Sequence, residues 1–331
     1  MLVFIRFISF LFFLLALNSA DNSVDTLTFS EYAQFYIKVK IDEGLKPSTI
    51  ARYQGIIDTY LLPYFSRYDL ALCNKVSTIR SFILALTALS PSGSVSRKSR
   101  KNIISVLTGV LQEAFYDETI ESNGAKKIPP TKLIKPDIMP FASHEVKLIL
   151  DASKGWFRIF LAVSFYSGLR TGEVFALLVK DVDLKNNLLH VNKSRGKFGV
   201  SSPKTKGSIR SLPIFAPLKA FLIPYISGKK PDDYLIINQY GNPFNDSSTI
   251  LRRHWYPLLN RLGLTPRVMY QTRHTFATNM LESGKFSVVE ISRYMGHVNT
   301  QMIFQRYTSY IDSEKRRTNI AVDIYFKNYE T

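Results

Sequence analysis

Residues 270–277 read YQTRHTFA, and residues 167–173 read SGLRTGE. Further along the chain, Tyr307 stands ten residues after His297. Arginine can bind phosphate oxygens through two parallel hydrogen bonds, and a phenol becomes nucleophilic when nearby cations favour its ionised form. With a lysine between the first two segments, these residues supply what an attack on one phosphodiester without metal needs: cations, a proton donor and a nucleophile.

Two arginines are candidates for the phosphate contacts. Arg170 follows Gly168-Leu169 at the junction between an apolar helix and a helix that Thr171 is expected to cap, so backbone on both sides would hold its guanidinium. Glu173, three residues on, can help to hold the first turn of that helix. Arg273 is the second candidate, because two guanidinium groups on both non-bridging oxygens would stabilise a pentacoordinate phosphorane. Taken alone, Arg170 also fits an exposed side chain in an ordinary capping segment.

Lys204 and Lys206 lie in the basic segment 202–207, just before an expected strand at 208–214. A lysine at a hairpin tip can enter a DNA groove and protonate the leaving 5′-oxygen, or contact the adjacent base. We prefer Lys204 as the acid, with Lys206 as the alternative. The simpler interpretation is a basic hairpin that contacts only phosphate.

Tyr307 is the preferred nucleophile, although an unperturbed phenol has a pKa of about 10 and needs surrounding cations to ionise. Tyr310 is the rival, three residues on and on much the same helical face. His297 is a candidate hydrogen-bond donor to the phosphate, and a structural role is its alternative. His274 follows Arg273 directly. Because neighbouring helix residues point in different directions, we expect His274 to pack or to support the site rather than to share the role of Arg273.

The chain has 331 residues, with 43 Lys and Arg against 26 Asp and Glu and a net charge of +17. This excess favours a polyanion partner, with binding that weakens as salt rises. Cys73 is the only cysteine, so no disulfide can form within the chain, and a small core residue is its simplest role. The sequence has no glycine-rich phosphate loop, no Gly-x-Ser-x-Gly turn and no His/Cys metal cluster, which disfavours the enzyme classes built on them.

Residues 1–20 have the layout of a secretory signal peptide: one arginine, an apolar run at residues 7–17, and then Asn18-Ser19-Ala20. An exported protein would not meet chromosomal DNA. A start codon assigned too far upstream therefore competes with a true targeting segment, and we favour the first. We treat residues 1–24 as a hydrophobic leader and expect a cytoplasmic protein. Mapping the mature N-terminus by mass spectrometry distinguishes the two, because export of a secreted basic protein predicts cleavage after Ala20.

Apolar residues recur at helical spacing through the rest of the chain, so we expect a mainly α fold with a small antiparallel β-sheet. Residues 25–120 are expected to form a helical domain, with helices at about 30–43, 47–62, 77–89 and 96–117. Ser30 can cap the first of these helices, and Pro63 is expected to end the second. The last helix starts with cations that predict a phosphate-tracking edge, a solvated face being the simpler alternative: Arg97, Lys98, Arg100 and Lys101. Residues 121–141 contain four prolines and are expected to be a linker.

Residues 142–331 are expected to form a second domain that combines strands and helices. Strands are predicted at about 187–192 and 208–214. Helices are predicted to begin near residue 143 and to cover about 156–166, 217–226, 248–262, 272–282, 287–295 and 300–310. Arg273 and Tyr307 then lie on separate helices, and Lys204 precedes a strand.

These motifs, in this order, resemble the tyrosine recombinases of the phage integrase family over about residues 28–315. The resemblance implies a helical core-binding (SAM-like) domain and a catalytic domain that clamp DNA from opposite sides. It matches Arg170 and Arg273 to the two family arginines, Lys204 to the hairpin lysine, His297 to the later His/Trp position and Tyr307 to the nucleophile. It also implies a 3′-phosphotyrosyl bond with a free 5′-hydroxyl, and no ATP or metal cofactor. As partners it implies double-stranded DNA sites, a homotetramer on synapsed DNA and accessory DNA-bending proteins.

One position departs from the family pattern. The family has His three residues before its second arginine, and here that residue is Tyr270, which we keep as an altered member of the site. A phenol can donate a hydrogen bond but is a poor proton shuttle at neutral pH. The alternative function is therefore a non-catalytic DNA-binding accessory protein derived from a recombinase. A protein that binds its site yet never crosslinks to it would favour that alternative.

Overall fold

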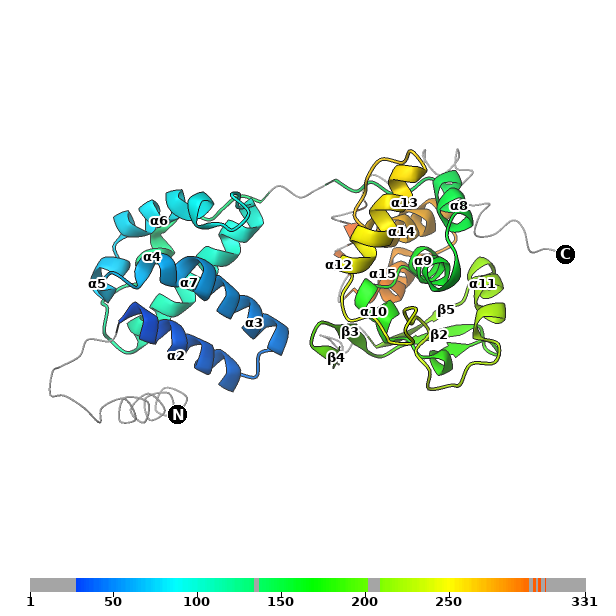
Figure 1. The fold of residues 1–331 in the computed structure, drawn as a ribbon, viewed down its shortest axis with the longest axis horizontal. Helices are drawn as coiled ribbons and strands as arrows, with labels where there is room; N and C mark the ends of the chain where they lie inside the picture. Colours follow the sequence, from blue (N-terminus) through cyan, green and yellow to red (C-terminus); the bar gives the residue numbers. More distant parts are fainter. Residues whose placement is uncertain are drawn as a thin grey trace. The chain divides into compact units, whose positions relative to one another are not determined.

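The structure is a computed structural model that describes residues 28–133, 137–201 and 209–297, together with residues 300, 301, 303, 304 and 307. The chain divides into two compact units, one before residue 136 and one from residue 136 onward (Figure 1). The described residues are mainly helical with small antiparallel sheets, as the sequence predicts. Residues 1–24, for which a leader is expected, lie outside the described part. None of the helices within these ranges has the length and apolar content that crossing a bilayer requires.

The first unit is a bundle of helices around one core. Its elements are α2 (Phe29–Asp42), α3 (Pro47–Ile56), a π-helical turn (Ile57–Leu61), α4 (Leu62–Phe65), α5 (Leu70–Cys73), α6 (Val76–Leu89), α7 (Arg97–Tyr116) and a 3-10 turn (Gly124–Lys127). Aromatic rings fill the core: the ring centroid of Phe65 lies 4.9 Å from that of Phe29 and 4.8 Å from that of Phe82. Cys73 is fully buried, with its thiol 3.5 Å from the Phe65 carbonyl oxygen, so it is a core residue as expected.

Two helix boundaries differ from the expected ones. Thr28, rather than Ser30, caps α2: its hydroxyl accepts from the Glu31 backbone N–H, and the Glu31 carboxylate accepts from Thr28 N–H at 2.7 Å. Pro63 does not end the second helix, because the chain widens into the π-helical turn just before it. That turn places Pro63 in the first turn of α4, where a residue without an N–H is tolerated.

Residues 122–128 pack onto the first unit, although composition suggests a linker from residue 121. Asn123 donates from Nδ2 to the Thr108 carbonyl oxygen at 2.9 Å, and Gly124 N–H donates to Asn74 Oδ1 at 2.7 Å. A Cβ at Gly124 would collide with the Asn74 carbonyl oxygen, so the close approach requires glycine. Paired polar groups thus order a segment that looks like a tether in sequence.

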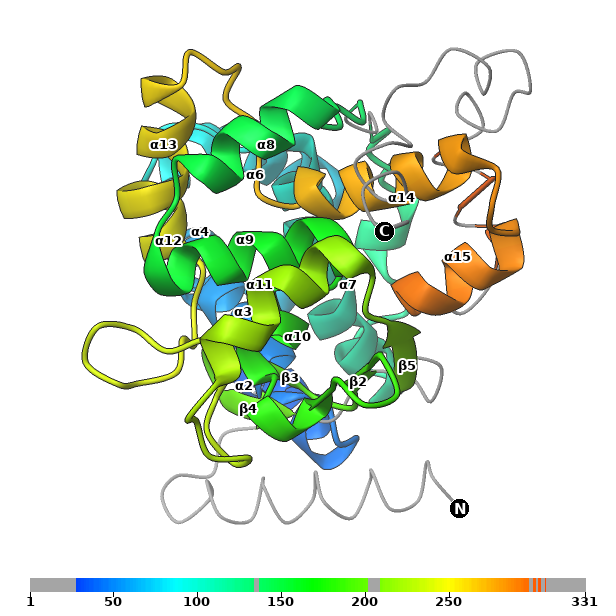
Figure 2. The same cartoon turned by 90° about the vertical axis from the view of Figure 1, so that its right-hand side faces the viewer.

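The second unit is organised around α9, an almost completely buried helix. Its helical elements are α8 (Ser143–Asp151), α9 (Gly155–Ser167), α10 (Thr171–Ala176), a 3-10 turn (Val179–Asp181), α11 (Ala216–Ile226), α12 (Ser248–Ile250), a π-helical turn (Leu251–Trp255), α13 (Tyr256–Arg261), α14 (Gln271–Ser283) and α15 (Val288–Met295). Helix α9 packs against α8, α10, α11 and α14 (Figure 2). In the last expected helix, at about 300–310, residues 301, 303, 304 and 307 are described and are helical.

Two antiparallel sheets complete the described part of the second unit. Strands β1 (Val182–Asp183), β2 (Leu188–Val191) and β5 (Arg210–Pro213) form one sheet in the order β1-β2-β5, and β3 (Ser194–Gly196) pairs with β4 (Gly199–Ser201). Burial alternates along β5, so that Arg210 and Leu212 are buried while Ser211 is exposed. The strands expected near 187–192 and 208–214 are therefore confirmed as β2 and β5. Lys204 and Lys206, between β4 and β5, lie outside the described residues.

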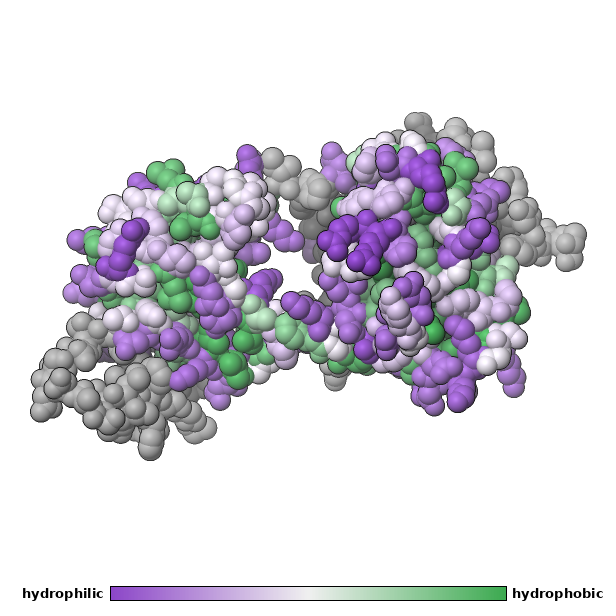
Figure 3. Space-filling view, in the orientation of Figure 1, coloured by the Kyte–Doolittle hydropathy of each residue, from purple (hydrophilic) through white to green (hydrophobic). Residues whose placement is uncertain are grey.

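Exposed cations mark each unit. The four cations Arg97, Lys98, Arg100 and Lys101 are all exposed at the start of α7. In the second unit, strongly hydrophilic side chains lie over α12 and the π-helical turn after it (Figure 3), where Arg252 and Arg253 are exposed. Both units therefore present positive charge that can attract a polyanion.

Candidate active site

Arg170 is held at the start of α10 by its own helix and by the end of another. Its backbone N–H donates to Glu173 Oε2 at 2.9 Å, and its Nη1 donates to Glu173 Oε1 at 2.9 Å. Its Nη2 donates to the Gly296 carbonyl oxygen at 3.2 Å. Arg170 itself, not Thr171, occupies the cap position of α10. The side chain remains 39% exposed, so the guanidinium is fixed in place and still open to a ligand.

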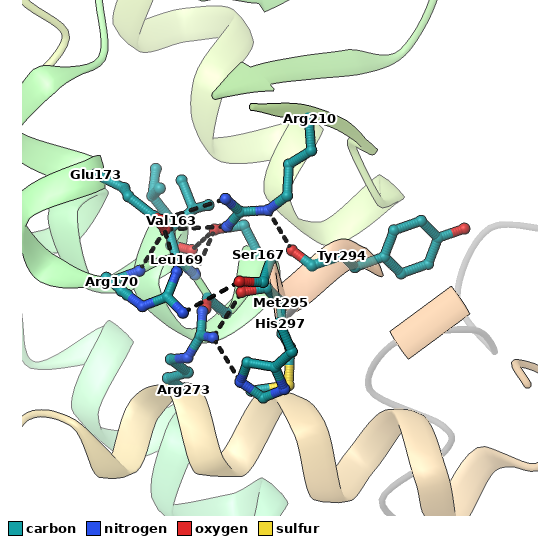
Figure 4. A network of polar contacts seen from close by, with 12 residues as sticks. Val163, Ser167, Leu169, Arg170, Glu173, Arg210, Arg273, Tyr294, Met295 and His297 are labelled. Carbon is teal, nitrogen blue, oxygen red and sulfur yellow. Dashed lines mark hydrogen bonds and ion pairs between the residues drawn. The ribbon is translucent and has the colours of Figure 1, made fainter. Parts of the chain in front are cut away.

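Arg273 lies on α14 and is only 1% exposed. Its Nη1 donates to the Gly168 carbonyl oxygen at 2.6 Å, and its Nη2 donates to the Met295 carbonyl oxygen at 2.6 Å (Figure 4). Gly168 ends α9 with φ +62°, and a Cβ there would collide with the ring of Phe276, so glycine is what lets α14 approach. Burial, first of all, lowers the pKa of Arg273 to about 10. The buried guanidinium therefore stays positively charged at neutral pH.

Glu173 anchors two guanidinium groups at once. Besides Arg170, its carboxylate accepts from Arg210 Nη2 at 2.9 Å and from Arg210 Nη1 at 3.2 Å. Arg210 Nε donates to the Tyr294 carbonyl oxygen at 2.7 Å, which ties β5 to α15. Burial alone would raise the pKa of Glu173, but the hydrogen bonds and charge of Arg210, followed by those of Arg170, hold it below its ordinary value. Glu173 is thus an ionised carboxylate that positions the cations around it.

Arg210 is a member of the network that the sequence motifs do not predict. The residue falls in a correctly predicted strand and in none of the motifs. One signal was available: alternation along the strand puts a charged residue on the same face as Leu212. A charged residue at an inward-facing position needs a buried partner of opposite charge, and Glu173 is that partner.

We expect Arg210→Met to destabilise the second unit by about 3–5 kcal/mol, because it leaves the buried Glu173 carboxylate with less compensation. The double variant Glu173→Met with Arg210→Met is expected to lose less, since it leaves no buried charge without a partner, and the guanidinium of Arg170, which also loses its carboxylate, is 39% exposed to solvent. Urea unfolding followed by tryptophan fluorescence measures this, because Trp156 and Trp255, the two tryptophans of the chain, both lie in the second unit.

The same pair predicts a dependence of stability on pH. The pKa of Glu173 is lower in the folded state than in the unfolded state. The ionised carboxylate therefore adds to the free energy of unfolding above the ordinary glutamate pKa, and this stabilisation is lost as pH falls through the folded-state pKa. Equal destabilisation by the single and double variants at neutral pH would contradict a compensated ion pair.

His297 follows α15 and lies against Arg273. Arg273 Nη2 is 3.0 Å from His297 Nε2, and because a guanidinium only donates, Nε2 accepts and the ring proton is on Nδ1. Burial, followed by the charges of Arg273 and Arg170, lowers the pKa of His297 to about 3. The imidazole is therefore neutral at physiological pH. Its Nδ1–H is buried and has no hydrogen-bond partner among the described residues.

Tyr307 is 2% exposed, and its hydroxyl lies 2.5 Å from His274 Nδ1. Tyr270 is 46% exposed at the start of α14, and its ring meets the His274 ring edge-on at a centroid distance of 5.1 Å. Arg273 and His274 contact different partners, as their adjacent places on a helix predict. The rival nucleophile Tyr310 lies outside the described residues.

Segments far apart in the chain thus meet in one polar network. It joins Arg170, Glu173 and Arg210 to Arg273 and His297 (Figure 4). Tyr307 is connected to the same helix as Arg273 through His274. All the described residues that the sequence singled out in this domain therefore lie in or beside this network.

Residues 141–314 match the phage integrase family, and residues 28–80 match the N-terminal SAM-like domain of phage integrases. The chain belongs to the phage integrase family. Among its relatives is prophage integrase IntR of Escherichia coli K12, 30% identical over 241 residues that cover 64% of this chain and 57% of IntR. The tyrosine recombinase XerC-like protein of Caldanaerobacter subterraneus subsp. tengcongensis is 26% identical over 333 residues, which cover 90% of this chain and 83% of the relative.

Solved integrase structures share the fold. The Tn1549 transposon integrase in complex with transposon right end DNA has a TM-score of 0.68 at 20% identity, covering 88% of this chain and 99% of that one. A λ integrase dimer bound to a COC′ core site has a TM-score of 0.68 at 18% identity, covering 88% and 79%. Phage integrases and tyrosine recombinases are enzymes that recombine DNA at specific sites. Membership of this family supports site-specific recombination as the function of the chain.

Proposed function

We propose that this integrase cuts and rejoins double-stranded DNA through a 3′-phosphotyrosine bond at Tyr307. The observation that carries the proposal is the convergence of Arg170, Arg273 and His297 in one network. Such a cluster can bind the two non-bridging oxygens of a phosphate and stabilise the charge that develops on them. Because the phosphotyrosine retains the energy of the broken phosphodiester, the reaction requires neither ATP nor a metal ion.

Two buried N–H groups support a phosphate in this place. Arg273 Nε and His297 Nδ1 have no hydrogen-bond partner among the described residues. A buried donor left unpaired costs about 1–3 kcal/mol, so such groups call for an explanation. Anionic phosphate oxygens are acceptors that would satisfy them. Arg170, which is 39% exposed in its side chain, would meet the same phosphate from the open side.

The remaining roles follow from the chemistry of the step. Tyr307 attacks the phosphorus while the 5′-oxygen leaves, and Lys204 gives that oxygen a proton, with Lys206 as the alternative donor. Tyr270, exposed at the start of α14, donates a hydrogen bond to the phosphate where the family has an imidazole. Glu173 holds Arg170, and the free 5′-hydroxyl of a partner strand later reverses the step.

We further propose that four protomers act on two synapsed DNA sites in the cytoplasm, with DNA-bending proteins as accessory partners. A λ integrase tetramer bound to a Holliday junction supports this assembly, with a TM-score of 0.66 to this chain at 16% identity. The exposed cations of α7 would track the DNA backbone in the first unit.

The decisive experiment is a covalent-adduct assay. Duplexes that bind the full-length protein are selected from a random library and then nicked beside the scissile phosphate. Cleavage then releases the short fragment that carries the free 5′-hydroxyl, so the reaction cannot reverse. We expect wild-type protein to form a DNA adduct that survives denaturation. A protein that binds these duplexes tightly and never forms the adduct would instead be an accessory DNA-binding protein.

We expect the exposed cations at the start of α7 to contribute to DNA binding rather than to the stability of the helix. Positive side chains at a helix N-terminus oppose the helix dipole, and α7 has no acidic residue in its first turn, so these residues do not serve the stability of the helix. We expect Lys98→Ala with Lys101→Ala to weaken DNA binding about equally for all sequences. The slope of log affinity against log salt should fall by about 1 for each phosphate that the variant no longer neutralises.

Gel-shift titrations at several salt concentrations measure that slope. The matched control is Lys147→Ala, which removes an exposed lysine of α8 that is paired with Asp151. An unchanged salt slope in the double variant would show that the α7 cations are only a solvated face. The thermal midpoint should not fall, since the helix loses an unfavourable interaction with its dipole.

A further inference from the structure

The Tyr307 hydroxyl is in direct contact with one imidazole. His274 Nδ1 lies 2.5 Å from it, and both residues are buried, His274 at 8% exposure and Tyr307 at 2%. When the ring proton of His274 is on Nε2, Nδ1 carries a lone pair aimed at the hydroxyl. The hydroxyl then donates to His274, and its proton has a base within hydrogen-bond distance.

The other imidazole of the network cannot take this proton. The Nε2 lone pair of His297 already accepts from Arg273 Nη2 at 3.0 Å, and its Nδ1 carries a proton. His297 is therefore a donor toward the phosphate and not a base. The remaining histidines lie elsewhere: His190 contacts Ser211 and His254 packs on Trp156, while His144 is exposed on α8.

Tyr270 is not a suitable base for Tyr307 either. It occupies the place where the family has histidine, and a neutral phenol is a poor proton acceptor. His274 follows four residues later on α14, so the two rings lie on one helical face, one turn apart, and touch edge-on. In this chain the imidazole that can serve Tyr307 is thus one helical turn beyond the altered position.

We propose that His274 is a catalytic residue that accepts the proton of Tyr307 as the phenol attacks the scissile phosphate. This rests on the proposed function. The Tyr307 O–H bond breaks, its proton passes to His274 Nδ1, and the oxygen lone pair forms the O–P bond. The P–O5′ bond breaks, and its electron pair leaves on the 5′-oxygen. A separate acid, Lys204 or alternatively Lys206, protonates that oxygen. When the 5′-hydroxyl attacks in the next step, His274 returns the proton to Tyr307.

The test compares His274→Asn and His274→Ala with wild type in single-turnover cleavage of nicked duplexes. Asparagine can place a carbonyl oxygen near the position of Nδ1, so it keeps a hydrogen-bond acceptor but cannot take the proton. We expect both variants to cleave about a hundredfold more slowly or worse, with duplex affinity within about twofold of wild type. His144→Ala, which removes an exposed imidazole from the same unit, is the matched control and should cleave at the wild-type rate.

Two chemical substitutions separate a base from a merely structural residue. A difluorotyrosine at position 307 has a more acidic phenol and depends less on a base, so it should recover at least tenfold of the rate lost in His274→Asn. A 5′-bridging phosphorothiolate leaves as a thiolate and needs no acid, so it should not rescue His274→Asn. It should rescue variants of the separate acid.

Cleavage by His274→Asn at or above the wild-type rate would overturn the inference and make the contact an inhibitory one. Rescue by the sulfur substrate, or no rescue by the acidic phenol, would overturn it as well. Failure of the proposed function is distinguishable, because wild-type protein would then form no adduct at all. Should His274→Ala fail to fold, His274→Asn decides alone, with tryptophan fluorescence reporting the integrity of the second unit.

Discussion

Tyr307→Phe is expected to abolish the covalent DNA adduct while leaving DNA affinity within about twofold of wild type. The substitution removes one oxygen and keeps the ring that packs in the core of the second unit. Its hydroxyl contributes a hydrogen bond to His274, so we expect a modest stability loss of about 1 kcal/mol. Adduct formation should fall below detection, because phenylalanine has no atom that can bond to phosphorus.

The measurement is denaturing electrophoresis of protein incubated with labelled, nicked duplexes, next to a gel shift of the same mixtures. Tyr310→Phe is the matched comparison, because Tyr310 is the rival nucleophile three residues away. We expect Tyr310→Phe to retain the adduct. If Tyr310→Phe lost the adduct and Tyr307→Phe kept it, Tyr310 would be the nucleophile and the assignment of Tyr307 would be wrong.

The contacts of Tyr307 illustrate where sequence reasoning stops. Residue types and their order are enough to single out Arg170, Arg273, His297 and Tyr307, because each carries recognisable chemistry in a recognisable motif. Helical geometry also predicts correctly that His274 and Arg273 point to different partners. The identity of the partner of His274 does not follow, since it lies 33 residues away on another helix. Contacts at this range depend on how helices pack.

Arg210 makes the same point for charge. Its strand is predictable from alternation, yet its pairing with Glu173 joins positions 37 residues apart in sequence. Two local features of the fold are not predictable from the sequence for a different reason. The π-helical turn before Pro63 and the ordering of residues 122–128 arise from backbone hydrogen bonds and buried amides, which leave almost no pattern in residue type. The lysines at positions 204 and 206 lie outside the described residues, so their roles stay predictions.

Arg273→Lys is expected to reduce the rate of DNA cleavage by about 10²–10³-fold, the loss typical of one donor to a developing oxyanion. The guanidinium of Arg273 contacts Gly168, Met295 and His297 through two nitrogens in one plane. A lysine carries the same charge on a single, more strongly hydrated nitrogen, so it cannot make these contacts together and costs more to bury. Charge alone therefore cannot replace the fixed geometry.

Single-turnover cleavage of two substrates checks this, one with a normal scissile phosphate and one with a neutral methylphosphonate at the same position. The methylphosphonate develops less negative charge in the transition state, so the loss caused by Arg273→Lys should shrink at least tenfold on that substrate. Arg252→Lys, at an exposed arginine of the same unit, is the control and should behave as wild type on both. Suppose instead that Arg273→Lys loses the same factor on both substrates and unfolds at lower urea. Arg273 would then act by holding α9, α14 and α15 together, and the proposal that it contacts the reacting phosphate would be wrong.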